Sequence, residues 1–485
     1  MKLSSPISLG VGFFSHLPKF AAVALITLGA SALLGAATVD PFANSATPPP
    51  PGYTGPTFQL SHNYPGRSVG LANPIPWEGV LGRKPISQAT AGAYADALRA
   101  AVAADMKVLV ADYPHWDASS RGWYNQPWLG SIREPIHGMF QATSTAGSLF
   151  NDPSLTVPFV NNFAAVYYNT TAAATLGGFW GKTAMTPTLT TAAGQFAEGS
   201  IIVKLAFTEV DGQQWPVMAG SPVWPIYTER VSEQTGNNDP AVSLFSVYLM
   251  QLDIIVKDSI ASPKTGWVFT TLVYDHRIPL KLGESFWDRM IPLGAMWGND
   301  PDVNSTTNPT TPLQETWVNP NAPAYSTATL GWGGRLSGPN DQAVQAPGDY
   351  IDPATGKPGT VPVANSSCMS CHSPAEWQFQ SFLLPGTANQ NGYYMAVPGS
   401  PTWMRWFQDR PGTVPMDPGG STIALDYDMM FAFKALEAWS QATGTAQAVE
   451  KRPLFMRPSE LRKGSPAGKA NNLGYNGLPF KSDRK

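Results

Sequence analysis

Two cysteines and a histidine stand together in the segment S-C-M-S-C-H-S-P-A-E-W, from Ser367 to Trp377. The chain has 485 residues but only two cysteines, Cys368 and Cys371, and His372 directly follows the second. Two thiols at this spacing before an imidazole form the attachment pattern of a c-type haem, in which the thiols bond to the porphyrin vinyl groups and the histidine ligates the iron. The segment therefore predicts one covalently bound haem c.

Three other roles are open to a pair of cysteines: a structural disulfide, half of a zinc site, or a thioredoxin-like redox pair. A zinc site needs a second Cys or His pair at matched spacing, and a redox pair needs a βαβ context. Neither is visible in the sequence, so haem attachment is the preferred interpretation.

A sixth iron ligand would separate an electron carrier from a reactive site, because a second strong protein ligand blocks substrate. Met416 is the candidate, since it lies in the turn-rich stretch G-T-V-P-M-D-P-G downstream of the haem segment. The alternative is a methionine that fills a gap in apolar packing. The other candidates are Met395, Met404, His62, His115, His137 and His276.

The first forty residues have the pattern of an export signal. Lys2 and Lys19 precede an apolar run over residues 20–34, and the small residues 35–37 follow it. This order predicts a secretory signal cleaved near Ala37, or else an N-terminal anchor, and hence a periplasmic protein. Haem attachment agrees with export, because it takes place outside the bacterial cytoplasm. The formal net charge of −3 and the 13 % of charged residues do not indicate a nucleic-acid-binding protein. No further membrane span is expected.

The middle of the chain has the pattern of strands. The runs S-I-I-V-K-L-A-F-T-E-V, S-L-F-S-V-Y-L-M-Q-L-D-I-I-V and G-W-V-F-T-T-L-V-Y-D are β-branched and aromatic and are bounded by turn residues. Helices are expected from Ser87 to Met106 and from Asp426 to Ala442. The predicted fold class is α+β, mainly β: an antiparallel β-sheet haem domain with flanking helices and long loops.

The expected organisation follows from these shifts in composition. The predicted parts are a signal peptide or anchor (1–37), a Pro-rich spacer (38–56), an N-terminal extension with one helix (57–156), the β-sheet haem domain (157–385) with a long surface loop (292–366), a helical extension (386–463) and a disordered tail (464–485).

Four segments, in order, resemble the cytochrome P-460 family, which includes the gas-binding cytochromes c'-beta. They are F-A-E-G-S-I-I-V-K (196–204), Q-L-D-I-I-V-K-D-S (251–259), G-W-V-F-T-T-L-V-Y (266–274) and C-M-S-C-H-S-P-A-E-W-Q-F (368–379). The resemblance implies an antiparallel sheet that carries a c-type haem. It also implies that Lys204 is the lysine joined covalently to the porphyrin edge, and that Asp253, in place of the family's usual glutamate, is a distal proton acceptor.

This chain departs from the family pattern in two places. More than ninety residues separate Tyr274 from Cys368, where the family has a short connection, and the arginine often found on an early strand is missing near Ala164. The chain would therefore be an enlarged and distant relative.

Strand alternation gives a separate argument about Lys204 and Asp253. Ile202, Lys204 and Ala206 are expected on one face, with residues 201, 203, 205 and 207 on the other. An apolar strand must either let the lysine reach water at an edge or provide a partner for it. Asp253 raises the same question, and the residues expected on its face are Phe245, Val247, Leu249 and Ile255.

The resemblance to the P-460 family implies redox chemistry on a small nitrogen compound, hydroxylamine or nitric oxide, with electrons passed to another cytochrome. The alternative is a non-catalytic electron-transfer or gas-binding haem protein. The residues expected to act are Cys368, Cys371 and His372 on the haem, and Lys204 and Asp253 beside it.

Overall fold

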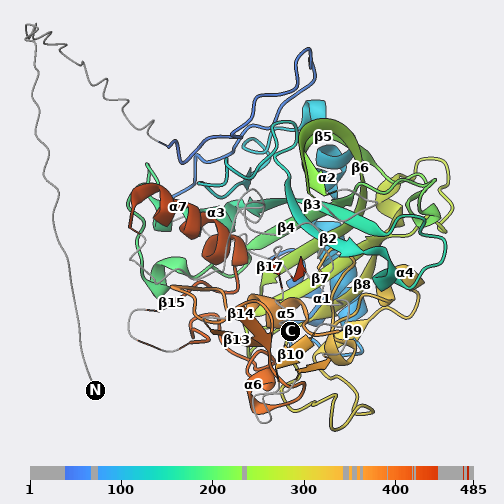
Figure 1. Ribbon diagram of the computed structural model, residues 1–485, viewed down its shortest axis with the longest axis vertical. Helices are drawn as coiled ribbons and strands as arrows, with labels where there is room; N and C mark the ends of the chain where they lie inside the picture. Colours follow the sequence, from blue (N-terminus) through green and yellow to red (C-terminus); the bar gives the residue numbers. More distant parts are fainter. Residues whose placement is uncertain are drawn as a thin grey trace, which may run out of the picture. The chain divides into compact units, whose positions relative to one another are not determined.

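A large antiparallel sheet forms the centre of the computed structural model (Figure 1). In the described part of the chain it has nine strands in the order β1-β3-β4-β6-β7-β8-β9, with β2 paired to β3 and β5 paired to β6. The strands are β1 (Trp123–Tyr124), β2 (Phe140–Ala146), β3 (Phe159–Asn169), β4 (Ile201–Thr208), β5 (Val223–Val231), β6 (Asn238–Lys257), β7 (Trp267–Tyr274), β8 (Met290–Met296) and β9 (Thr316–Val318). The prediction of a mainly β, antiparallel fold is confirmed, and β4, β6 and β7 are the three predicted strands.

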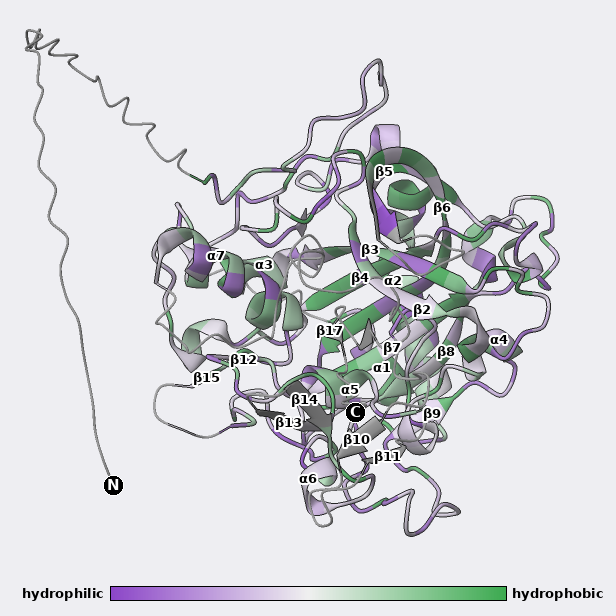
Figure 2. Ribbon diagram, in the orientation of Figure 1, coloured by the Kyte–Doolittle hydropathy of each residue, from purple (hydrophilic) through white to green (hydrophobic). Residues whose placement is uncertain are grey.

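Both faces of the central strands β4, β7 and β8 are largely buried, in keeping with their mostly apolar residues (Figure 2). Val203 and Leu205 of β4 point into a core shared with helix α2 (Ala91–Ala111), here called the α2-side core. Ile202 points into the opposite core, which holds the haem segment and is called the pocket-side core. The alternation predicted for β4 is therefore confirmed, and it places Lys204 on the pocket side.

A β-bulge corrects the face predicted for part of β6. Ala206 pairs with Gln251 but the next residue, Phe207, pairs with Leu249, so that Met250 is an extra residue in β6. A bulge of one residue reverses the alternation on its two sides. Val247 and Leu249 consequently lie in the α2-side core, opposite to the face of Asp253, whereas Ile255 shares its face as expected.

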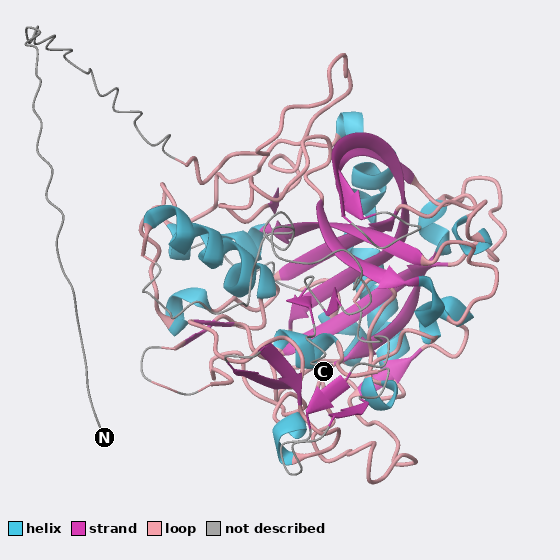
Figure 3. Cartoon of the chain, in the orientation of Figure 1, coloured by secondary structure: helices cyan, strands magenta, loops and turns pink. Residues whose placement is uncertain are grey.

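Short helices and loops surround the sheet (Figure 3). The further α-helices are α1 (Glu78–Leu81), α3 (Thr170–Trp180), α4 (Ala324–Thr327), α5 (Cys368–His372), α6 (Pro401–Met404) and α7 (Leu436–Thr443), and η7 (Phe431–Ala435) is a π-helix. Single 3-10 turns are η1 (Tyr113–His115), η2 (Gly147–Phe150), η3 (Thr191–Gly194), η4 (Pro216–Met218), η5 (Phe286–Arg289) and η6 (Trp332–Gly334). The small strand pairs are β10 (Asp349–Ile351) with β11 (Pro358–Thr360), β12 (Glu376–Trp377) with β15 (Ile423–Ala424), β13 (Gly386–Asn389) with β14 (Gly392–Met395), and β16 (Leu473–Gly474) with β17 (Leu478–Pro479).

Both predicted helices differ from the observed ones at their ends. The first begins at Ala91, with Thr90 rather than Ser87 in the capping position, and continues to Ala111. The second begins only after Tyr427, because Asp426 and Tyr427 have φ values of 51° and 66°, which a right-handed helix excludes. This left-handed pair has a function in the site described below.

The segment 292–366 is more than the predicted surface loop. It supplies most of β8 and all of β9 to the sheet. Its Arg335 is fully buried and donates to the main-chain carbonyls of Asn299, Asp300 and Val303. A guanidinium that ties three carbonyls together holds two distant parts of this segment to each other.

The structure describes residues 39–66, 75–231, 238–341, 349–351, 358–360, 364–389, 392–417, 419, 422–445, 473–474 and 478–479. Within them, no helix combines the length and the apolar character that crossing a bilayer requires. Of the two units into which the chain divides, the one from Asp40 onward contains the sheet. The predicted signal or anchor (1–37) lies outside the described residues, as does the predicted tail (464–485) apart from β16 and β17. The predicted spacer is in part ordered, because the Trp128 amide donates to the Pro41 carbonyl and the Ala46 amide donates to the Gly130 carbonyl.

Candidate functional site

The haem segment forms one capped helical turn, α5. The Ser367 hydroxyl accepts from the Ser370 amide at 3.1 Å, and the Ser370 hydroxyl accepts from the Ser367 amide at 2.8 Å. This capping box satisfies main-chain groups that would otherwise be orphaned at the start of the turn. Cys368 and Cys371 lie three residues apart on the turn, so both thiols line one pocket, and they form no disulfide. The burial of both thiols raises their pKa, that of Cys371 to about 12, so both are neutral near pH 7.

The His372 imidazole lines the same pocket and is fixed by its Nδ1 atom. Nδ1 lies 2.7 Å from the Tyr427 carbonyl oxygen, which can only accept, so Nδ1 carries the proton and the lone pair is on Nε2. The Phe269 ring packs edge-on against the imidazole at 4.9 Å. Burial lowers the pKa of His372 to about 4, so the ring is neutral near pH 7. A neutral imidazole whose other nitrogen donates to a carbonyl is the usual arrangement of a metal-ligating histidine.

The left-handed conformation of Asp426 and Tyr427 orients the Tyr427 carbonyl toward His372. The Asp426 carboxylate is buried and accepts from Lys257 Nζ at 2.6 Å and from Trp267 Nε1 at 2.8 Å. Both donors belong to the ends of strands of the sheet. The orientation of the His372 ring is therefore set by the sheet through one buried carboxylate.

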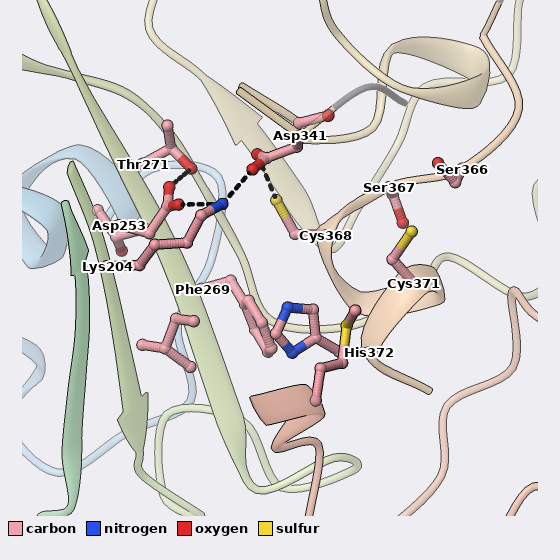
Figure 4. Close-up of a pocket in the computed structure, with 14 residues that line it drawn as sticks. Lys204, Asp253, Phe269, Thr271, Asp341, Ser366, Ser367, Cys368, Cys371 and His372 are labelled. Atoms are coloured by element: carbon pink, nitrogen blue, oxygen red, sulfur yellow. Dashed lines mark hydrogen bonds and ion pairs between the residues drawn. The ribbon is translucent and has the colours of Figure 1, made fainter. Parts of the chain in front are cut away.

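A polar cluster of Lys204, Asp253 and Asp341 lies in this pocket, beside the cysteines (Figure 4). Lys204 Nζ is 2.6 Å from Asp341 Oδ1 and 3.2 Å from Asp253 Oδ2. Lys204 on β4 and Asp253 on β6 are directly opposite in the strand register, whereas Asp341 comes from the segment after η6. The lysine side chain is 22 % exposed and thus meets its partners inside the protein instead of reaching bulk water.

Neutral donors from the sheet hold both carboxylates. Thr271 Oγ1 donates to Asp253 Oδ1 at 2.8 Å, and Gln251 Nε2 is 2.9 Å from both Asp253 oxygens and 3.2 Å from both Asp341 oxygens. Burial, reinforced by the negative charge of Asp341, raises the pKa of Asp253 to about 6. Burial also acts to raise the pKa of Asp341, but the charge of Lys204 and the hydrogen bonds from Lys204, the Gly338 amide and Gln251 together outweigh it, so the pKa of that carboxyl is lowered. The two carboxyls therefore differ: the pKa of Asp253 lies above the usual range of an aspartate, whereas that of Asp341 lies below it.

Five residues predicted from the sequence thus meet in one pocket: Cys368, Cys371, His372, Lys204 and Asp253. Met416 does not line it; this side chain is buried in the pocket-side core. Of the described residues, the other candidate sixth ligands, Met395, Met404, His62, His115, His137 and His276, do not line it either. His137 instead stacks on Trp224 with ring centroids 4.2 Å apart.

The sequence did not single out Asp341, Gln251 or Met429, all close to the chemistry. Met429 lines the pocket and lies two residues after Tyr427, whose carbonyl accepts the hydrogen bond of His372. Asp341 ends the tetrapeptide G-P-N-D, where its Oδ2 accepts from the Gly338 amide at 2.8 Å. The sequence does place an aspartate at the end of a predicted turn here, but such an aspartate is typical of turns in general and does not indicate a functional site.

Gly338 allows this turn to approach β6. A Cβ atom at residue 338 would overlap the side-chain oxygen of Gln251, which accepts from the Asn340 amide at 2.9 Å. We expect Gly338→Ala to push the turn from the sheet and to lower the free energy of unfolding by about 1–3 kcal/mol, as overpacking does. Chemical denaturation measures this loss. Gly79→Ala is the matched control because its Cβ would meet no atom within 4 Å; equal stabilities for the two variants would contradict the expectation.

The residues of the pocket fit a haem c. Two neutral thiols on one turn, an imidazole with Nε2 unprotonated, and apolar walls from Phe269 and Ile255 line the pocket. The buried Ser337 hydroxyl, which also lines the pocket, has no hydrogen-bond partner among the described residues and remains available to a ligand. Across the described chain, no three His, Cys, Asp or Glu side chains are grouped as ligands for a metal ion.

Comparisons of the chain with family models, with curated proteins and with solved structures give no match.

Proposed function

We propose that this protein is an exported, periplasmic mono-haem c-type cytochrome that carries out redox chemistry on a small nitrogen compound, such as hydroxylamine or nitric oxide. It passes the electrons to another cytochrome. One observation carries the proposal: Lys204 and Asp253, chosen from strand motifs, line the same pocket as Cys368, Cys371 and His372. The apolar run at residues 20–34 supports export.

The cysteines would hold the haem through two thioether bonds. Each thiol would add across one vinyl group, with the sulfur on one carbon and the thiol hydrogen on the other, so that the attachment would need no oxidant or reductant. His372 would ligate the iron through Nε2, since Nδ1 is engaged with the Tyr427 carbonyl. When bound, the haem supplies an iron that exchanges one electron at a time.

The side chains of the polar cluster would handle protons. Converting hydroxylamine to nitric oxide releases three protons and three electrons, so the site must accept protons while the electrons leave for the acceptor cytochrome. Asp253 is the acceptor, because its pKa of about 6 lets it be ionised at neutral pH and still bind a proton. Thr271 and Gln251 orient its oxygens. The charges of Lys204 and Asp341 favour hydroxylamine, the more polar of the two proposed substrates.

Mass spectrometry of a proteolytic digest, together with hydroxylamine-dependent reduction of an added cytochrome c, tests this proposal. The expected result is porphyrin on the peptide that contains Cys368 and Cys371, and turnover that depends on it. A protein that acquires no covalent porphyrin would refute the proposal. The digest also reports whether Lys204 is joined to the porphyrin, as the resemblance to the P-460 family implies; the proposed activity does not require that bond.

Met416 offers a test of the electron-carrier alternative. Because its side chain does not line the pocket, we expect Met416→Ala to leave the absorption spectrum of the ferrous protein unchanged. Met429→Ala is the matched comparison, since Met429 does line it. Loss of a low-spin spectrum in Met416→Ala would establish that residue as a ligand and favour a carrier with a closed iron.

A further inference from the structure

The ion-pair geometry of the pocket bears on the state of Lys204. A lysine can attack or bond to a carbon atom only as the neutral amine, whereas an ammonium is a donor and a point charge. Lys204 Nζ lies within 3.2 Å of carboxylates on two different segments, Asp253 of β6 and Asp341 of the turn 338–341. Two negative partners around one nitrogen favour the charged form.

The contact of Lys204 with Asp341 is shorter than its contact with Asp253, and other residues hold the Asp341 carboxylate in place. Its Oδ1 is 2.6 Å from Lys204 Nζ, and its Oδ2 accepts from the Gly338 amide. Gln251 of β6 binds the turn 338–341 to the sheet, because its side chain donates to Asp341 and accepts from the Asn340 amide. The carboxylate therefore cannot swing away without breaking contacts with a strand of the central sheet.

We propose that Asp341 is a positioning residue that fixes Lys204 as an ammonium between two carboxylates, so that in the haem-loaded protein Lys204 is an electrostatic member of the site and not a covalent link to the porphyrin. The inference rests on the proposed haem. It assigns a role to the long segment 292–366, which delivers Asp341 to strands far from it in sequence.

Amine acylation of the haem-loaded protein, read by mass spectrometry, tests the proposal. Only neutral amines react, so Lys204 should react slowly, with the exposed Lys182 as the reference within each sample. In Asp341→Asn the amide still accepts from the Gly338 amide but lacks the charge. We expect acylation of Lys204 relative to Lys182 to rise about tenfold, which a free-energy change of about 1.4 kcal/mol produces. Asp302→Asn, at an exposed position of the same segment, should change nothing.

Two results would overturn the proposal. One is a wild-type digest in which the peptide containing Lys204 carries porphyrin, a result that needs no variant. The other is equal Lys204 reactivity in wild type and Asp341→Asn at equal haem content. The failure of the haem proposal is recognised separately, because the cysteine peptide would then carry no porphyrin whatever the reactivity of Lys204.

Discussion

The Cys368→Ala, Cys371→Ala double variant is expected to contain no covalently bound haem. Both thiols line one pocket, and the chain has no other cysteine to replace them. Haem staining of a denaturing gel and the alkaline pyridine spectrum measure covalent haem directly. The expected change is from one haem per chain to none, which is the largest effect that any substitution here should produce.

Ser373→Ala is the matched control for this variant. It follows the same helical turn but does not line the pocket, so it should retain full haem content. Circular dichroism establishes whether the sheet of the double variant has formed. Haem that stays attached to the denatured double variant would show that another residue carries the bond, and the assignment of Cys368 and Cys371 would fail.

The second large effect is expected from Asp253→Asn. The amide keeps the shape of the carboxylate but cannot accept a proton, and loss of a general base commonly lowers turnover by about 10²–10⁴-fold. Steady-state oxidation of hydroxylamine, at equal haem content, measures the loss. Asp302→Asn again serves as the control, and unchanged turnover in Asp253→Asn would remove this residue from the mechanism.

The pH dependence of the wild type gives an independent check on Asp253. A base acts in its ionised form, and burial raises the pKa of Asp253 to about 6. Turnover should therefore be low below pH 6, rise through that value, and level off above it. Asp253→Asn should lack this rise, whereas a rise that persists in the variant would belong to another group.

Local patterns were enough to predict the strands and the residues that alternate on them. Lys204 is found on the predicted face because β4 pairs regularly on both sides around it. The haem segment is equally local, since thiols three residues apart on one turn share a side. Such features depend only on residues that are close together in the sequence, and they can therefore be predicted from it.

Features that depend on distant contacts could not be predicted in this way. The bulge at Met250 reverses the faces of β6, but no residue type marks it. Asp341 reaches Lys204 across 137 residues, and nothing periodic in the turn-rich segment 292–366 indicates which residue will meet the sheet. The left-handed conformation of Asp426 and Tyr427 delays the predicted C-terminal helix, and it becomes understandable only with Trp267 and Lys257 in place.

The pocket is closed by contacts that join remote parts of the chain, and this has a consequence for the order of folding. Tyr168 donates to Asp428 across 260 residues, and Trp267 to Asp426 across 159. Contacts at such separations form slowly, because long loops must close first. The thiols of Cys371, which is buried in the native state, and of Cys368, which is partly buried, remain reachable in a chain that has not yet made these contacts. Under the proposed function, haem is therefore added to a partly folded chain, and the last segments to dock enclose it.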